Sequence, residues 1–168
     1  MTTLAERERL WPSWRFMLKH PAHFIALGFG SGLSVIAPGT LGTLVAFPLH
    51  AGLELQLDAT GELAVIALAF IAGVWACGRT GRALGAADHG AMVWDEIVAF
   101  LLVLVFTPRE AAWQAGAFVL FRFFDIVKPS PIRYYDRTLK GGFGVMFDDL
   151  IAAFYTLFVL AWAKHFFG

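Results

Sequence analysis

Hydrophobic residues in this chain gather into five stretches that contain no Asp, Glu, Lys or Arg. Segments rich in glycine, proline and charged residues separate them. None of the stretches reaches the roughly 20 residues of a standard membrane-spanning helix, but each is long enough for a short buried or membrane-embedded helix. We therefore expect an all-α protein whose main helices include residues 41–53, 63–78, 97–108, 111–121 and 150–163.

The composition of the chain favours a membrane protein over a soluble one. Hydrophobic residues make up 58% of the 168 residues and charged residues only 15%, and the mean hydropathy is +0.66. Trp75, Trp94, Trp113 and Trp162 lie near the ends of the stretches, as in an interfacial aromatic belt. We expect a membrane-embedded bundle of four to five short hydrophobic helices. An unusually apolar soluble helical protein is the alternative.

The first 22 residues differ from the rest of the chain. They contain no uninterrupted apolar core of the kind that a secretory signal requires. Instead, apolar residues recur at helical spacing among basic ones, at Leu10, Trp11, Trp14 and Leu18. We expect an N-terminal amphipathic interfacial helix in residues 1–22 and a single membrane-embedded domain in residues 23–168. A plain soluble first helix is the alternative for the N-terminal segment.

Helices that cross a membrane in alternating directions place every second connection on the same side. One side then receives the end of the second stretch, the start of the third, the end of the fourth and the start of the fifth. It carries Asp88, Asp95, Glu96, Asp125, Asp148 and Asp149 together with Arg79, Arg82, Arg122, Lys128, Arg133, Arg137 and Lys140. The opposite side carries Glu54, Asp58, Glu62, Arg109 and Glu110. The excess of basic residues places the first side in the cytoplasm.

Two whole-chain properties exclude other classes of function. The formal net charge is zero, so the overall balance gives no reason to expect nucleic-acid binding. Cys77 is the only cysteine, which excludes an internal disulfide.

The acidic side predicts a metal site. Carboxylates are costly at membrane depth and repel one another when clustered, so a group of them needs a compensating cation. Asp125 lies at the expected C-terminal end of a helix, where the helix dipole disfavours an anion. Oxygen ligands suit Mg²⁺, Mn²⁺ or Ca²⁺, and the lack of nearby cysteine argues against structural zinc. Arg122 and Lys128, three residues to either side of Asp125, offer ion pairs as the alternative to metal ligation.

Basic and glycine-rich segments next to these acids predict phosphate chemistry. Arg122, Lys128 and Arg133 would bind phosphate oxygens while a metal polarises the phosphorus centre. Residues 28–34 and 38–43 are glycine-rich, and a helix that begins near residues 40–43 would offer backbone N–H groups to a phosphate. Close packing of helices at these glycines is the alternative. No Cys-x5-Arg or Asp-x-Asp-x-Thr/Val phosphatase motif is present.

Seven short motifs occur in order along most of the chain. They are GFGSGLS at 28–34, APGTLGTL at 37–44, DHG at 88–90, VWDE at 93–96, FRFFDIVKP at 121–129, PIR at 131–133 and GGFGVM at 141–146, which leads into Asp148 and Asp149. With these motifs the sequence resembles the phosphatidylglycerophosphatase A family of bacterial membrane lipid phosphatases over about residues 23–155. Val35 stands where the family pattern has proline, and Thr43 where serine is commoner.

This resemblance implies Mg²⁺-dependent removal of the terminal phosphate of phosphatidylglycerol phosphate, with Mn²⁺ as the alternative metal. It implies a phospholipid substrate and a multi-pass protein of the bacterial inner (cytoplasmic) membrane whose active site faces the cytoplasm. The implied catalytic residues are Asp95, Glu96, Asp125 and Asp149, and the implied metal ligands are these four and Asp148. The implied substrate-binding residues are Ser34, Thr40, Arg122, Lys128 and Arg133, with Asp88 and His89 as second-tier candidates. The number of metal ions and the oligomeric state stay open.

Two other classes of function use the same acidic residues. A carboxylate-lined carrier of divalent cations would show cation flux, although no interrupted central helix of the kind common in carriers is visible in the sequence. A structural subunit would use the acids only in salt bridges, so that a chelator would change neither its stability nor its activity.

Overall fold

A computed structural model describes residues 11–130 and 132–167, and all the regular structure in these residues is helical. The all-α prediction is therefore confirmed. Each hydrophobic stretch corresponds to one of the longer helices, α4 (Pro38–Glu54), α5 (Ala59–Leu84), α6 (Trp94–Phe106), α7 (Ala111–Val127) and α9 (Gly141–Phe167). Only the stretch 97–108 extends beyond its helix, by two residues. The shorter elements are α2 (Trp14–Leu18), α3 (Pro21–Ala26), the 3-10 helix η1 (Gly28–Leu33) and α8 (Ile132–Thr138).

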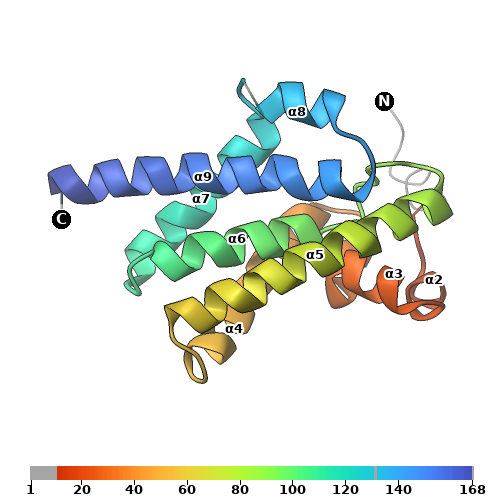
Figure 1. Cartoon of the computed structure of the whole chain (residues 1–168), viewed down its shortest axis with the longest axis horizontal. Helices are drawn as coiled ribbons and strands as arrows, with labels where there is room; N and C mark the ends of the chain where they lie inside the picture. The colour runs from red at the N-terminus through yellow and green to blue at the C-terminus, as the bar shows by residue number, and fades with distance from the viewer. Residues whose placement is uncertain (1–10, 131, 168) are drawn as a thin grey trace.

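Helix α6 forms the centre of the bundle, and α4, α5, α7 and α9 pack around it (Figure 1). Beyond its first turn, which carries Asp95 and Glu96, its side chains are apolar on every face, which is the pattern of a helix surrounded by other helices. Phe100 is fully buried, with Phe47 of α4 and with Phe118 and Phe121 of α7 at ring-centroid distances of 5.3, 5.9 and 5.4 Å. Burial of one such side chain contributes about 2 kcal/mol, so this aromatic group fixes α4 and α7 against α6.

Helices α5 and α9 are long and apolar enough to cross a membrane. They contain 26 and 27 residues, so the charge-free stretches gave lengths that were too short. The reason is that both helices continue through charged residues at the cytoplasmic side of the expected topology, such as Arg82 and Asp148. At 1.5 Å per residue, 26 residues span about 39 Å, more than the roughly 30 Å of a hydrocarbon core.

The outer faces of these two helices are apolar. Only 28% of the apolar window of α5 and 50% of that of α9 is buried. Phe154, Phe158 and Trp162 recur every fourth residue on α9 and are all more than half exposed. An apolar stripe of this size on the surface indicates contact with a membrane, which agrees with the expected membrane association.

The structure describes the N-terminal segment only from residue 11 onward. Residues 1–10, including Leu10, lie outside the described residues. Helix α2 begins only at Trp14, where the Ser13 side chain accepts a hydrogen bond from the amide of Phe16 at 3.3 Å. Trp14 and Leu18 are exposed, whereas Met17 is buried, so the described part has one apolar outer face. Helix α3 extends across the expected boundary between residues 22 and 23.

Five helix ends meet at one end of the bundle, and in Figure 1 the end of α5 and the start of α9 mark it on the right. They are the starts of α4, α6 and α9 and the ends of α5 and α7, and several contacts between named residues join them. The opposite end holds Arg109 and Glu54, whose Nε and Oε2 atoms are 3.1 Å apart, and the buried pair His50 and Glu62 at 2.8 Å. The two sets of charges that the alternating topology separates therefore lie at opposite ends.

The glycine-rich segment at residues 141–146 is helical, whereas the hydrophobic stretch that predicts this helix begins only at residue 150. Helix α9 begins at Gly141, and Asp148 and Asp149 lie about two turns inside it. A Cβ atom on Gly142 would lie 1.9 Å from the Val74 carbonyl oxygen of α5. Because only glycine permits this approach, packing of α9 on α5 overrides the low helix propensity of the segment.

Candidate active site

Two hydrogen bonds to backbone carbonyl groups fix the position of the first turn of α6. The amide of Val93 donates to the Ala26 carbonyl at 2.9 Å, and Trp94 Nε1 donates to the Ala69 carbonyl of α5 at 3.0 Å. The chain is thereby held between α3 and α5 just before Asp95 and Glu96. The acids at this helix start consequently face into the bundle end, and Asp95 is only 8% exposed.

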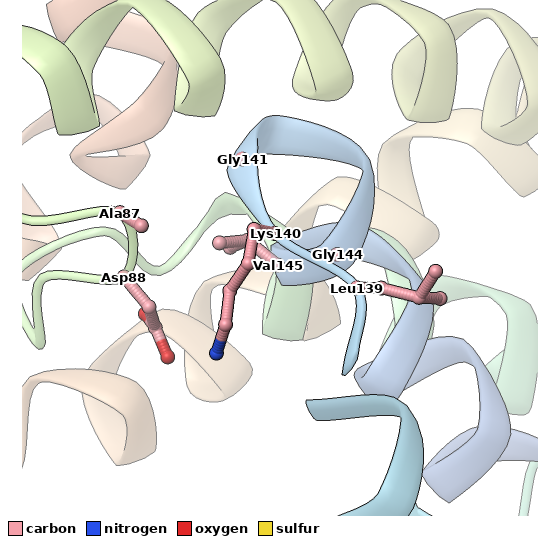
Figure 2. Close-up of a pocket in the computed structure, with 7 residues that line it drawn as sticks. All are labelled: Ala87, Asp88, Leu139, Lys140, Gly141, Gly144 and Val145. Carbon is pink, nitrogen blue, oxygen red and sulfur yellow. The ribbon is translucent and has the colours of Figure 1, made fainter. Parts of the chain in front are cut away.

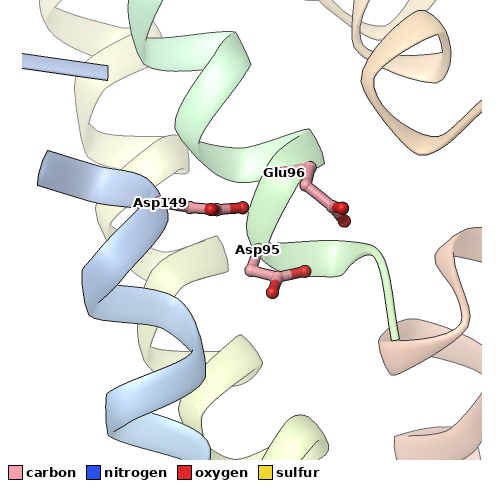
Figure 3. A group of neighbouring side chains, drawn as sticks. All are labelled: Asp95, Glu96 and Asp149. Atoms are coloured by element: carbon pink, nitrogen blue, oxygen red, sulfur yellow. The ribbon is translucent and has the colours of Figure 1, made fainter. Parts of the chain in front are cut away.

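Asp149 of α9 extends toward the first turn of α6, where Asp95 and Glu96 lie (Figure 3). One carboxylate oxygen from each of the three residues can be chosen so that all lie within 4.8 Å of one another. Asp149 is 3% exposed. The structure therefore brings together three of the five predicted metal ligands.

Each of these three carboxylates has one oxygen atom without a hydrogen-bond partner in the described part of the chain. Among residues 11–130 and 132–167, no hydrogen-bond donor reaches Asp95 Oδ1, Glu96 Oε2 or Asp149 Oδ2, and all three atoms are buried. An unpaired buried carboxylate oxygen is costly, and three together repel one another. The donor set contains only carboxylate oxygen, so it fits a hard divalent cation such as Mg²⁺ or Mn²⁺.

Arg122 of α7 contacts the acidic group at Glu96. Its Nη1 atom lies 2.5 Å from Asp125 Oδ2 and 3.5 Å from Glu96 Oε1. The same atom is 3.5 Å from the hydroxyl of Thr43, which is fully buried. Asp125 is thus the ion-pair partner of Arg122, as the alternative interpretation allowed, and it is also an electrostatic neighbour of Glu96 and Asp149.

The start of α4 completes this part of the site. A Cβ atom on Gly39 would lie 2.1 Å from Glu96 Oε1 and 3.0 Å from Arg122 Nη2, so glycine is required for the close approach. Helix α4 begins at Pro38, slightly before the expected position, after Ala37 in a left-handed conformation with φ 48°. The amide of Leu41 donates to the Ala37 carbonyl. The amides of Gly39 and Thr40 precede this first bond, at the positive end of the helix dipole.

Asp148 and Lys128 form a second charged contact beside the three-carboxylate group. The Nζ atom of Lys128 donates to Asp148 Oδ2. Lys128 follows the end of α7 in a left-handed conformation with φ 45°, which redirects the chain toward α9. Adjacent residues of a helix point about 100° apart. Asp148 therefore faces Lys128 while its neighbour Asp149 faces α6.

The other predicted site residues lie around this centre. Ser34 Oγ donates to the Ile36 carbonyl at 2.8 Å in the turn before α4, and Thr40 is half-buried in the first turn of α4. Arg133 is exposed on α8 and donates to the Val127 carbonyl at 3.3 Å. The structure thus does not join Arg133 to the carboxylate group.

The second-tier residues lie in the loop between α5 and α6. Asp88 is exposed and lines, together with Lys140, a small pocket of about 190 Å³ in front of the start of α9 (Figure 2). Burial lowers the pKa of His89, although Asp88 opposes this. His89 Nδ1 accepts a hydrogen bond from the Ala91 amide at 3.1 Å. The neutral imidazole therefore supports the loop.

A family profile described as Phosphatidylglycerophosphatase A matches residues 24–164. The chain belongs to the phosphatidylglycerophosphatase A family. The predicted resemblance is thereby confirmed, and so is the prediction of an enzyme of the phosphatase class.

Individual relatives support the same family. The chain is 45% identical over 150 residues to a phosphatidylglycerophosphatase A of Haemophilus influenzae, which covers 89% of this chain and 92% of the relative. It is 40% identical over 155 residues to the Escherichia coli protein of the same name, with coverage of 90% and 88%. A putative phosphatidylinositol-3-phosphatase of Bacteroides thetaiotaomicron is 39% identical over 147 residues, with coverage of 83% and 91%. No solved structure gives a significant match.

Two residues of the site, Gly39 and Thr43, have no individual role in the prediction from the sequence. Gly39 and Thr43 lie four residues apart and so share one face of α4, the face that meets Glu96 and Arg122. Thr43 Oγ1 donates to the Gly39 carbonyl at 2.8 Å and remains an acceptor for Arg122. The spacing was visible in the sequence, but the partner that α4 would meet was not.

Proposed function

We propose that this protein hydrolyses the terminal phosphate monoester of phosphatidylglycerol phosphate, releasing phosphatidylglycerol and inorganic phosphate. The observation that carries the proposal is the buried group of Asp95, Glu96 and Asp149. Each of the three has an oxygen without a hydrogen-bond partner among the described residues, and Glu96 Oε1 of the group contacts Arg122. The names of the relatives with 45% and 40% identity support the same reaction. In the cell it would serve phospholipid biosynthesis.

Asp95, Glu96 and Asp149 would hold Mg²⁺, with Mn²⁺ as the alternative. Bound there, the metal would supply a Lewis acid that withdraws charge from the phosphate. Asp125 supports the group by holding Arg122 against Glu96. Asp148 holds Lys128 at the edge of the same site.

Arg122 would bind the nonbridging oxygens of the reacting phosphate. Its guanidinium group is fixed by Asp125 and Thr43, and it faces the start of α4, where the amides of Gly39 and Thr40 precede the first helical hydrogen bond. Fixed donors of this kind stabilise charge without having to reorganise during the reaction. They would also orient the phosphorus centre toward the carboxylates.

The reaction requires one proton acceptor among these residues. Water forms a bond to phosphorus through its oxygen and gives one proton to this acceptor. The bond to the glycerol oxygen breaks, and that oxygen takes up a proton from the protonated acceptor or from solvent water. Glu96 is the best-placed acceptor. Its Oε1 atom contacts Arg122, which would hold the phosphate, and its Oε2 atom has no partner among the described residues.

The apolar outer faces of α5 and α9 favour a lipid substrate at a membrane surface. We place the site on the cytoplasmic face of the bacterial inner membrane, because the basic connections lie at the same end as the acids. The Bacteroides relative, named as a putative phosphatidylinositol-3-phosphatase, makes the choice of lipid a matter for experiment.

The test measures phosphate release from phosphatidylglycerol phosphate and from phosphatidylinositol 3-phosphate, in mixed micelles with Mg²⁺. We expect faster release from phosphatidylglycerol phosphate and none from either lipid with folded Asp95→Asn. Absence of release from phosphatidylglycerol phosphate across metals and detergents would contradict the proposal. Cation flux into liposomes in the same preparation would favour the carrier.

A further inference from the structure

A second polar pocket lies beside the carboxylate group, between the end of α7 and α8. It has a volume of about 410 Å³, a size typical of small-molecule sites. Two basic side chains and three hydroxyl-bearing ones contribute to its wall. These residues are Lys128, Arg133, Ser130, Tyr134 and Thr138.

Lys128 links this pocket to the neighbourhood of the carboxylate group. Lys128 lines the pocket, and its Nζ atom also pairs with Asp148, the sequence neighbour of Asp149. An anion in the pocket would therefore lie next to an anion bound at Arg122, but it would not occupy the same place. Two anionic groups of one ligand fit this arrangement if a short linker joins them.

Arg133 is a basic group in the wall of the pocket. Its side chain is exposed, and the hydrogen bond that the structure gives it runs from Nη2 to the Val127 carbonyl at 3.3 Å. A guanidinium group has five N–H donors and binds phosphate oxygens in a bidentate manner. Arg133 is thus equipped to bind a phosphate at the pocket mouth.

The rim of the pocket is apolar, which favours a lipid phosphate over a soluble one. Val127 and Tyr134 line the pocket and are 43% and 63% exposed, and Ile126 beside them is 69% exposed. Exposed apolar residues around a basic pocket are expected where a protein surface meets lipid headgroups.

A separate apolar hollow lies near this pocket, on α9. The hydroxyl of Tyr155 donates to the Ser130 carbonyl at 3.3 Å and so connects the pocket to the helix. Tyr155 also lines a hollow of about 300 Å³ with Ile151, Phe154 and Phe158. The surface next to the basic pocket therefore offers room for a hydrocarbon chain.

We propose that the pocket at Arg133 binds the phosphodiester of the lipid substrate while the terminal monoester occupies the site at Arg122. The inference rests on the proposed function, because phosphatidylglycerol phosphate carries a diester and a monoester that one glycerol unit separates. The diester fixes the lipid, the acyl chains follow α9, and the monoester reaches the carboxylates. The pocket therefore selects lipids that carry an anionic diester next to the reacting phosphate.

The test measures binding, so it does not depend on turnover. Dihexanoyl phosphatidylglycerol keeps the diester and the chains but lacks the monoester, dihexanoylglycerol lacks both phosphates, and inorganic phosphate with Mg²⁺ probes the monoester site. Binding of each to the full chain in detergent is measured by titration calorimetry. We expect Arg133→Gln to lower the affinity for dihexanoyl phosphatidylglycerol about tenfold, because the variant loses a charge-assisted hydrogen bond to the phosphate. The affinity for inorganic phosphate should stay unchanged.

Matched variants distinguish the pocket from a general charge effect. Arg79→Gln removes an exposed arginine of α5 at the same end of the bundle and should leave both affinities unchanged, whereas Arg133→Lys should recover part of the lipid affinity. Equal lipid affinity in the wild type and Arg133→Gln would overturn the inference, as would an equal loss of phosphate affinity. If the diester binds as expected but phosphatidylglycerol phosphate is not hydrolysed, the proposed function fails and the diester site stands.

Discussion

Asp149 of α9 and Asp95 of α6 come from segments more than 50 residues apart, yet they present carboxylate oxygens within 4.8 Å of each other at the end of the bundle. Both side chains are buried, and each has an oxygen that no donor reaches within the described residues. A pair of this kind is stable only with a cation or a proton between the two groups.

Asp95→Asn should remove the response of the protein to Mg²⁺. The wild type should gain stability on metal addition, by about 2.7 kcal/mol at a concentration 100 times the Kd. The variant should unfold at the same temperature with and without Mg²⁺. Without metal it should be at least as stable as the wild type, because one buried charge is gone. Thermal unfolding in detergent with Mg²⁺ or with a chelator measures this, and an undiminished metal response in the variant would exclude Asp95 as a ligand.

Asp148→Asn and Asp149→Asn should behave differently although the residues are adjacent. Asp149 faces the unpaired group on α6, so its change should abolish the Mg²⁺-dependent rise in unfolding temperature. Asp148 faces Lys128, so Asp148→Asn should keep that rise and lose only the stability of the ion pair. The same unfolding assay compares them. Equal loss of the metal response would mean that both residues are ligands.

Arg122→Gln should cost both stability and activity. The change leaves Asp125 and Glu96 without their cation in a nearly buried site, where breaking a pair costs about 3 kcal/mol. Activity should fall on the order of a hundredfold or more. Denaturant unfolding and phosphate release measure the two effects. Arg109→Gln is the matched control, since Arg109 is 78% exposed where it meets Glu54 and its pair is worth less than about 1 kcal/mol.

Two glycines of α4 provide a second matched comparison. Gly39→Ala would push a Cβ atom into Glu96 and Arg122, so activity should fall on the order of tenfold or more. Gly52→Ala meets nothing within 4 Å and should raise helix stability by roughly 0.5–1 kcal/mol with unchanged activity. Phosphate release and thermal unfolding of both variants test this. An active Gly39→Ala variant would mean that the start of α4 does not need its close contact with the site.

The sequence pattern was sufficient to predict much of the fold. Apolar stretches located the main helices, and alternating direction placed Asp95, Asp125 and Asp149 at one end. Helix lengths were underestimated because charged residues at a helix end still belong to the helix, as Arg82 does in α5. The start of α9 at Gly141 is not predicted by the hydrophobic pattern, because the helix there depends on the contact of Gly142 with Val74. Local helix propensity contains no information about that contact.

The candidate site could be predicted as a set of residues but not as an arrangement. Spacing alone left open whether Arg122 and Lys128 pair with Asp125 or serve a ligand. In the structure Arg122 meets Asp125 and Glu96, while Lys128 turns to Asp148. That division depends on the left-handed turn at Lys128 and on the packing of α7 against α9. The role of Thr43 likewise depends on a partner from another helix.

Phosphate release from phosphatidylglycerol phosphate as a function of Mg²⁺ concentration tests the central claim most directly. In one detergent preparation, the wild type should release phosphate only when Mg²⁺ or Mn²⁺ is present, and a chelator should stop the reaction reversibly. Folded Asp149→Asn should release phosphate at least on the order of a hundredfold more slowly at every metal concentration. Equal phosphate release by the wild type with Mg²⁺ and with the chelator would contradict the claim that the three carboxylates hold a catalytic metal.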